Sequence, residues 1–428
     1  MAIRASLLPL HLLPSPFLSI LPCRSRSRNV SAHSAMGHRG GSSAEAAEAK
    51  HVVVCGAGVI GSCTAYFLAQ KGVKVTVVEK CGVASAASGK AGGFLALDWC
   101  DGSLLKDLAR ASFDLHETLA EELNGRERYG YRRLDALSLV LEETTGGGVA
   151  SHSPKLPAWI DGCVKRAAPI GTQKTTAQVH PFLFTQAVLS DAMDKHGVRL
   201  LMGNVGGVEL EPAEGEGYRV TGVMVDGNFV GADAVVLAMG PWTGTNRLVS
   251  DLTTISGIKA HSIVLYPQNP NVISPHALFL QYKTQEGKQL DPEVYPRPSG
   301  EVYVCGMSEE VEIPVDSDRV KPRKEAIVML RRIASTVSSE LVNAELRIEQ
   351  ACFLPCSVDG RPLIGGIPNV AGAYVGTGHS CWGILNGPAT GSSLAELIVD
   401  GVAKTVDLSP FDPARFGQTS HRQKQVAL

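Results

Sequence analysis

The chain has 428 residues, of which 44% are hydrophobic and 19% are charged, a composition typical of a globular protein with room for two domains. The net charge of −2 gives no reason to expect nucleic acid as a partner. Ten cysteines are scattered, without a C-x-x-C pair or a His/Cys cluster at metal spacing. This pattern predicts a reducing compartment and no metal site.

The first 50 residues differ in composition from the rest. They are rich in serine and carry no acidic residue before Glu45. Their arginines are Arg4, Arg24, Arg26, Arg28 and Arg39. Such a segment is typical of an organelle transit peptide, so the expected location is a plastid or a mitochondrion. There are two alternatives: the segment is a disordered extension without a targeting role, in which case the protein is cytoplasmic, or it is a secretory signal. The apolar stretch 7–22 is interrupted by prolines and is too short to cross a membrane, so we expect no transmembrane segment.

Residues 52–79 read VVVCGAGVIGSCTAYFLAQKGVKVTVVE. An apolar β run is followed by G-x-G-x-x-G, a helix, a second β run and an acidic residue, which predicts a dinucleotide-binding βαβ unit. In such a unit Gly56 makes the tight turn, Gly58 lets the backbone approach a pyrophosphate, and Gly61 lets the helix pack on the strand. Glu79 is expected to accept hydrogen bonds from the ribose hydroxyls.

Further elements follow from periodicity and turn residues. In chain order we expect a helix over 103–123, a strand over 131–141, a loop over 143–157, a helix over 180–196, a strand over 198–210, a hairpin over 220–230, a strand over 233–240, short strands and one helix (324–337) over 255–350, and a final helix near 387–402. This order predicts a nucleotide-binding domain (51–100, 160–250 and 350–410) interrupted by a second domain (101–159 and 251–349). The expected tail is 411–428.

Three more stretches extend the pattern: SGKAGG at 88–93, AMGPW at 238–242, and GTGHSCWGILNGPATGSSLAELI at 376–398. GAGVIG at 56–61 and Glu79 precede them in the chain. Because of these motifs, taken together, the chain resembles the FAD-dependent amine oxidoreductases of the glycine oxidase/D-amino-acid oxidase (DAO) family over roughly residues 51 to 405. The resemblance implies an α/β (α+β) fold. It comprises a Rossmann-like FAD-binding domain and a discontinuous antiparallel-sheet substrate domain, the glutathione-reductase-type flavoprotein architecture.

The resemblance also implies FAD as the cofactor and gives its contacts residue by residue. The expected contacts are Gly56, Gly58, Val59, Ile60, Gly61, Glu79, Lys80, Ser88, Lys90, Ala91, Gly92, Gly93, Val205, Gly240, Trp242, Gly378, Trp382, Gly383 and Ile384. The loop 378–387 and its helix are expected to aim N–H groups at the flavin edge that becomes negative on reduction. His379 and Gly383 are therefore the candidate catalytic residues, although His379 also fits a loop histidine bonded to backbone.

The implied activity is oxidation of the CH–NH bond of a small amine or amino-acid-like substrate, with oxygen or another acceptor and no dedicated base. Leu354 stands where glycine-oxidase-like members carry the arginine for the substrate carboxylate. Other basic residues that could replace it are Lys90, Arg297 and Arg347, and further pocket candidates are Lys259, His261 and Tyr303. Cys352 stands at a spacing similar to that of the flavin-linking cysteine of the sarcosine-oxidase branch, so covalent attachment is one possibility.

Two other functions remain open. One is a flavin-binding protein with a mainly trafficking or binding role, as in relatives associated with endosomal sorting. The other is an NAD-dependent dehydrogenase, which would need the βαβ unit but neither SGKAGG nor the final loop and helix.

Overall fold

The structure is a computed structural model that describes residues 50–143 and 156–417. The predicted transit peptide, most of the predicted loop 143–157 and the end of the predicted tail lie outside the described residues. By its contacts, Glu48–Leu428 forms one unit. The division into an FAD-binding and a substrate domain therefore stays a prediction.

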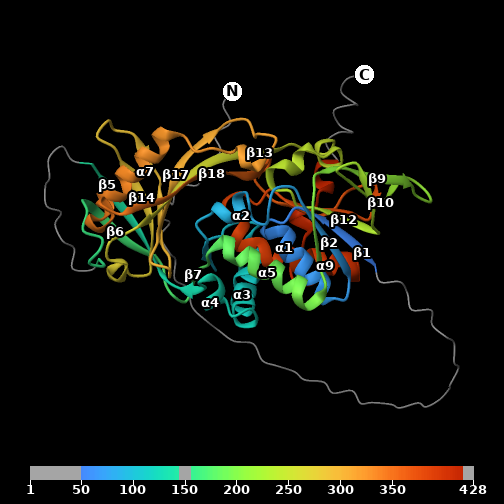
Figure 1. Cartoon of the computed structure of the whole chain (residues 1–428), viewed down its shortest axis with the longest axis horizontal. Helices are drawn as coiled ribbons and strands as arrows, with labels where there is room; N and C mark the ends of the chain where they lie inside the picture. Colours follow the sequence, from blue (N-terminus) through green and yellow to red (C-terminus); the bar gives the residue numbers. More distant parts are fainter. Residues whose placement is uncertain (1–49, 144–155, 418–428) are drawn as a thin grey trace, which may run out of the picture. The chain divides into compact units, whose positions relative to one another are not determined.

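A six-stranded sheet that contains the predicted βαβ unit forms the middle of three layers (Figure 1). Its order is β19 (Leu363–Gly366), β21 (Ala373–Thr377), β12 (Ala234–Leu237), β1 (His51–Cys55), β2 (Lys74–Glu79) and β8 (Arg199–Met202). All neighbours are parallel except β19 and β21. Val52, Val53 and Val54 of β1 are fully buried, because this sheet is covered on both faces.

Helices cover one face of this sheet. Val52 and Val54 pack with α1 (Val59–Gln70), α3 (Lys106–Glu122), α5 (Pro181–His196) and α9 (Gly383–Asp400) in one core. On the other face, Val53 and Cys55 pack with a four-stranded sheet. Its strands are β9 (Val205–Pro212), β10 (Tyr218–Val225), β11 (Asn228–Gly231) and β20 (Val370–Ala371). The result is a helix, parallel-sheet and antiparallel-sheet sandwich.

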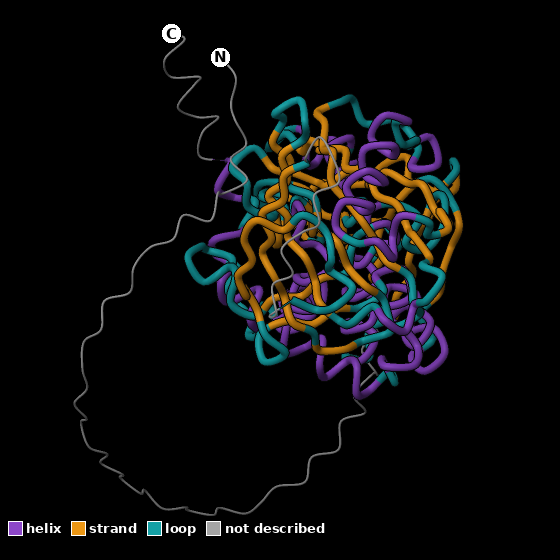
Figure 2. The backbone as a smooth tube through the Cα atoms, turned by 90° about the vertical axis from the view of Figure 1, so that its left-hand side faces the viewer, coloured by secondary structure: helices purple, strands orange, loops and turns teal. Residues whose placement is uncertain are grey.

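An eight-stranded, mostly antiparallel sheet forms the second large element. Its strands are β5 (Asp135–Glu142), β6 (Val164–Gly171), β13 (Ile255–Tyr266), β14 (His276–Lys283), β15 (Gln289–Leu290), β16 (Glu293–Pro296), β17 (Val302–Glu310) and β18 (Glu345–Ser357). Helix α7 (Lys324–Val337) buries its apolar side against one face, through Ile327, Leu330 and Ile333. Figure 2 looks from the side of β5, β6 and β14, with strands in orange and helices in purple.

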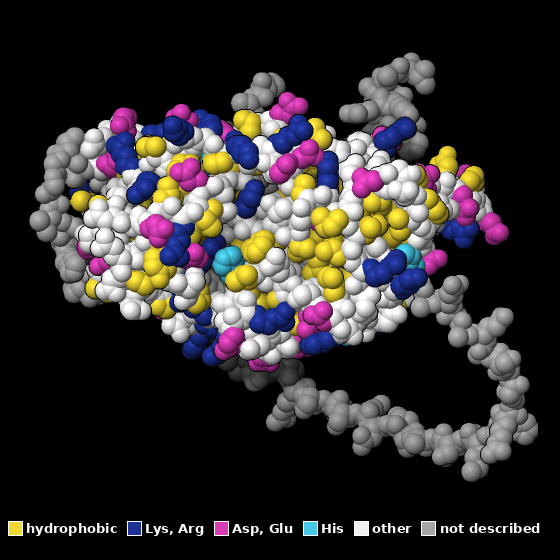
Figure 3. All heavy atoms as spheres, in the orientation of Figure 1, with side chains coloured by type: hydrophobic (Ala, Val, Ile, Leu, Met, Phe, Trp, Pro, Cys, Tyr) yellow, Lys and Arg dark blue, Asp and Glu magenta, His cyan; other side chains and the backbone are white. Residues whose placement is uncertain are grey.

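The remaining elements are short. They are β3 (Phe94–Ala96), β4 (Arg132–Arg133) and β7 (Thr176–Gln178) in a three-stranded sheet, α2 (Ala87–Lys90), α4 (Gly125–Tyr129), α6 (Arg247–Ser250) and α8 (Ser339–Val342), and the 3₁₀ turns Gly240–Thr245, Pro270–Val272, Ser317–Arg319, Ser380–Trp382 and Ser409–Phe411. On the face of the molecule seen in Figure 3, basic side chains (dark blue) and acidic side chains (magenta) are interspersed. Among the described residues, no helix combines the length and apolarity needed to cross a membrane.

The predicted helices 103–123, 180–196 and 324–337 are confirmed as α3, α5 and α7, and the hairpin is confirmed as β10 and β11. The hairpin turn uses Asp226 and Gly227, both with positive φ, as a two-residue turn requires. Two predictions need correction. The strand 198–210 is two strands in different sheets, divided at Gly203. The final helix starts at Gly383 instead of near 387. Helix α3 packs in the core of the parallel sheet.

Candidate cofactor and active site

A cavity of about 650 Å³ lies where α1 and α9 begin. Its walls come from the turn after β1, the end of β2, α2, the start of β9, the 3₁₀ turn after β12, the loop 313–317, the end of β18 and the start of α9. Parallel strands thus direct their carboxyl ends at one place, the usual ligand site of such sheets.

The glycines of the first turn have separate steric reasons. Gly56 has φ +107°, which allows the tight turn from β1 into α1, and its N–H donates to the Val78 carbonyl oxygen of β2 at 2.7 Å. A Cβ at Gly61 would lie 1.9 Å from the Gly56 oxygen, so this glycine sets the closeness of helix and strand. A Cβ at Gly58 would meet the Ser88 Oγ at 3.1 Å and no backbone within 4 Å. Gly58, unlike Gly61, therefore leaves open space that belongs to the cavity.

Two polar side chains organise this end of the cavity. Glu79 Oε2 accepts the N–H of Ala57 at 2.8 Å, and Oε1 accepts the N–H of Cys81 at 2.9 Å. Ser88 Oγ accepts the N–H of Val59, the first residue of α1, at 2.9 Å. Glu79 Oε2 can accept a further hydrogen bond from a ribose hydroxyl, and the Ser88 hydroxyl can donate to a phosphate, whereas Oε1 also accepts the N–H of Gly82.

The far end of the cavity joins β9 to the loop 313–317. Val205 lines it at the start of β9. Lys80 also lines it and forms an ion pair with Asp316, and Ser85 lies 3.2 Å from Ser317, oxygen to oxygen. Nothing in the local sequence of residues 313–317 marks this loop as part of the site, so it is not among the predicted residues.

At the other end, the first turn of α9 meets the cavity through Gly383 and Ile384. No side chain caps this helix, and its N-terminal N–H groups give that end a positive partial charge. A Cβ at Gly383 would meet only the His379 Cβ, at 3.7 Å. The protein itself therefore does not require glycine here, and the freed space faces the cavity.

His379 also lines the cavity but is 3% exposed, and its Nε2 lies 3.0 Å from the Thr390 Oγ1. Burial lowers the pKa of its imidazole to about 3, so the ring is neutral at physiological pH. The side chain ties the loop to α9. It is not placed as a titrating acid or base.

Glycines also bring the two helix starts together. A Cβ at Gly387 would lie 2.8 Å from a Val59 methyl, and one at Gly391 would lie 2.5 Å from the backbone carbon of Cys63. These two glycines are four residues apart on one side of α9, so the helix packs directly on α1 there. Figure 1 shows α9 in red beside α1 in blue. The N-termini of both helices therefore reach the same cavity.

Most of the predicted cofactor contacts line the cavity. They are Gly56, Gly58, Val59, Ile60, Glu79, Lys80, Ser88, Ala91, Val205, Gly240, Trp242, Gly383 and Ile384. The predicted residues outside the lining are Gly61, Lys90, Gly92, Gly93, Gly378 and Trp382.

The structure gives several of the outlying residues a packing reason. A Cβ at Gly92 would meet the Tyr295 ring at 2.4 Å, and one at Gly93 would lie 2.0 Å from the Val179 oxygen. The Lys90 carbonyl accepts the Tyr303 hydroxyl at 2.9 Å, which joins α2 to the eight-stranded sheet. The segment SGKAGG thus packs against the eight-stranded sheet. Of its residues predicted to contact the cofactor, only Ser88 and Ala91 line the cavity.

The substrate-side candidates lie largely outside the cavity. Leu354 lines it, but Lys259 forms an ion pair with Glu309 at 3.1 Å, and His261 lies 3.6 Å from the same carboxylate. Further candidates outside the lining are Lys90, Arg297, Tyr303 and Arg347. Cys352 is 7% exposed and also outside the lining, and burial raises the pKa of its thiol to about 11. Its geometry is that of a small buried apolar residue, which does not favour flavin attachment.

A carboxyl group behind the wall was also missed. Glu293 accepts the Tyr295 hydroxyl at 2.6 Å, and burial raises its pKa. Cys381, which lines the cavity, is exposed, and Glu293 lies near its thiol. An acidic residue in the short apolar run EVYP was the only local signal.

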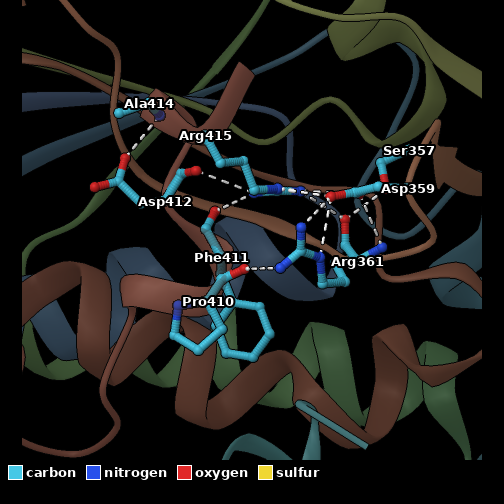
Figure 4. Close-up of polar contacts among 8 residues, drawn as sticks. All are labelled: Ser357, Asp359, Arg361, Pro410, Phe411, Asp412, Ala414 and Arg415. Carbon is cyan, nitrogen blue, oxygen red and sulfur yellow. Dashed lines mark hydrogen bonds and ion pairs between the residues drawn. The ribbon is translucent and has the colours of Figure 1, made fainter. Parts of the chain in front are cut away.

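The chain end supports the wall from outside. Asp359 binds Arg361 and Arg415, and Arg415 also donates to the Phe411 carbonyl at 2.7 Å (Figure 4). Although partial burial opposes it, the hydrogen bond from Arg415 lowers the pKa of Asp359 to about 2. This network fixes the turn that follows Leu354 and the end of β18. Residues 411–417, predicted as tail, are part of the fold.

The residues present fit a flavin dinucleotide. Gly58 and Gly383 leave space that a Cβ would fill, Gly240 has nothing within 4 Å of its Cβ position, and two helix N-termini offer donors for anionic groups. The cavity volume is in the usual range for cofactor sites.

Comparisons with known proteins agree with this geometry. Residues 51–397 match the family described as FAD dependent oxidoreductase. An oxidoreductase of Schizosaccharomyces pombe is 32% identical over 390 residues, 85% of this chain and 98% of that protein. A glycine oxidase of Pseudomonas aeruginosa is 27% identical over 388 residues, 85% of this chain and 99% of that protein. The crystal structure of glycine oxidase from Geobacillus kaustophilus superposes with a TM-score of 0.71 at 22% identity, covering 86% of this chain and 99% of that one.

The fold predicted from sequence is confirmed, and so is the cofactor class. The nicotinamide and trafficking alternatives find no support in these matches. The chain belongs to the DAO family of FAD-dependent oxidoreductases.

Proposed function

We propose that this protein oxidises the CH–NH bond of a small amine or amino-acid-like substrate. The observation that carries the proposal is the uncapped start of α9 at Gly383, which faces a cavity built for a dinucleotide. FAD bound there would accept the hydride equivalent from the substrate carbon. The glycine oxidases among the matched proteins support the amine class.

The wall near α9 suits a substrate that arrives as the neutral amine. Among the described residues, the charged side chains that line the cavity are Glu79, Lys80 and Asp316, all at the dinucleotide end. His379 is neutral and bonded to Thr390. The chain therefore supplies position and exclusion of water, and the proton of a charged amine must leave before oxidation.

The carboxylate of an amino acid finds no arginine at residue 354. Leu354 gives this wall an apolar contact, and the turn behind it is held by Asp359 and Arg415. We propose that the preferred substrate is an amine whose substituent at this point is apolar or uncharged.

The test is anaerobic mixing of the FAD-loaded protein with a panel of primary and secondary amines and with amino acids. Bleaching of the flavin absorbance by at least one amine is expected. The rate should rise with pH through the pKa of the substrate's own amine. An FAD-loaded protein that no amine bleaches would overturn the proposal.

A Leu354→Arg variant tests substrate choice. An arginine fork binds carboxylates, so affinity for glycine or sarcosine should rise about tenfold or more, while affinity for uncharged amines falls. Leu354→Met is the matched control, because it keeps size and apolar character. If both variants bind amino acids with equal affinity, the substrate carboxylate does not bind beside residue 354.

Location and electron acceptor are further proposals. The composition of residues 1–50 supports import into a plastid or mitochondrion, and fusing this segment to a fluorescent protein tests it. Molecular oxygen is the proposed acceptor, and peroxide formation during amine turnover in air is the measurement.

A further inference from the structure

Helix α9 contains a proline close to the cavity, and this changes its backbone bonding. Pro388 is the sixth residue of the helix and has no N–H. In a regular helix residue 388 would bond the carbonyl of Ile384, and residue 389 that of Leu385. The turn that presents Gly383 and Ile384 to the cavity is therefore not held to the rest of α9 in the ordinary way.

Two side chains of α3 bond groups at this break. His116 Nε2 lies 2.9 Å from the Ile384 carbonyl oxygen, and Ser112 Oγ accepts the N–H of Ala389 at 3.0 Å. Ser112 and His116 are four residues apart, so they face α9 together, and both are fully buried. A carbonyl oxygen only accepts hydrogen bonds, so Nε2 carries the proton.

We propose that His116 and Ser112 are positioning residues that fix the first turn of α9, and with it the N–H groups that the turn presents to the flavin. The reasoning is geometric: the released carbonyl belongs to Ile384, which itself lines the cavity. Without the donor from His116, this buried carbonyl would lack its partner, and the turn would shift to find another. The inference requires bound FAD but not an amine substrate.

Sulfite is the probe. It adds reversibly to oxidised flavin and leaves the ring negatively charged, so its dissociation constant reports how well the site stabilises that charge. With FAD saturating, His116→Phe should weaken sulfite binding about tenfold and lower the flavin reduction potential. His116→Gln, which keeps an N–H donor, should recover most of the affinity. Ser112→Ala should show a smaller change in the same direction.

Thr185→Val is the matched control. Thr185 is a fully buried residue of α5, and its hydroxyl donates to the Pro181 carbonyl at 2.9 Å, away from the cavity lining. It should lower the melting temperature and leave sulfite binding unchanged. If His116→Phe and Ser112→Ala behave like this control, the proposal is wrong. If His116→Phe does not fold, Ser112→Ala against Thr185→Val decides alone.

Discussion

Glycine residues in the first turn show how one residue type serves two purposes. Gly61 is required by the protein, because its missing Cβ lets the Gly56 carbonyl approach, whereas Gly58 borders only the Ser88 side chain and the cavity. The sequence motif treats them alike, and the geometry separates them.

This difference gives a prediction. Gly58→Val should leave the melting temperature of the FAD-free protein within about 2 °C, since Ser88 can rotate, but should abolish FAD retention. Gly61→Val should unfold the protein or destabilise it by more than about 3 kcal/mol, because backbone cannot move away. Melting curves with and without FAD check both. Equal loss of stability in the two variants would contradict the assignment of open space to Gly58.

At the scale of the helix, α9 carries the same contrast along its length. Gly391 lies against the Cys63 backbone, but Gly383 lies against open space. Gly391→Val should therefore destabilise the fold by about 2–4 kcal/mol through overpacking. Gly383→Val should keep the fold and lower the flavin potential or turnover.

Urea unfolding measures the stability of both variants, and a redox titration measures their flavin potentials. A Gly383→Val protein with unchanged potential and activity would show that this turn does not tune the flavin. A stable Gly391→Val protein would show that α9 can move away from α1.

Much of the fold could be predicted at this scale, since buried strands such as β1 and β12 are continuous apolar runs that a glycine follows within three residues. The start of α9 could not, because Pro388 normally marks the beginning or end of a helix, and the compensating His116 lies 268 residues away. The loop at Asp316 and the Arg415 network could not be predicted from the sequence for the same reason. Their partners meet only in the folded chain.

At the scale of the whole molecule, three histidines link stability to pH: His116 and His379 are buried, and His180 is partly buried. Burial lowers the pKa of His116 and His180 to about 4 and that of His379 to about 3, from an ordinary value of 6.5. The unfolded chain binds these protons at a higher pH than the folded chain does. Their contribution is therefore fully present above pH 6.5 and is lost as the pH falls toward 4.

Each histidine should contribute a slope of about 1.4 kcal/mol per pH unit in this window, or about 4 kcal/mol per unit for the three. Urea unfolding at pH 7, 6, 5 and 4.5 measures the slope, and His180→Gln should reduce it by about a third. Asp359, with a pKa near 2, adds its own loss only below about pH 4. Constant stability from pH 7 to pH 5 would contradict the neutral state of these rings in the folded protein.

The order of strands has a consequence for biosynthesis. Of the described strands, β1 is synthesised first, yet Val52 pairs with Ala234, and Val235 in turn pairs with Ala373. The residues that close the cavity, from Leu354 to Ile384, follow later, and Arg415 follows them. The apolar strands of the six-stranded sheet therefore lack some of their partners during most of translation. Their exposed apolar residues make the nascent chain a substrate for chaperones. The cavity is complete only once the segment from Leu354 to Ile384 has joined the fold.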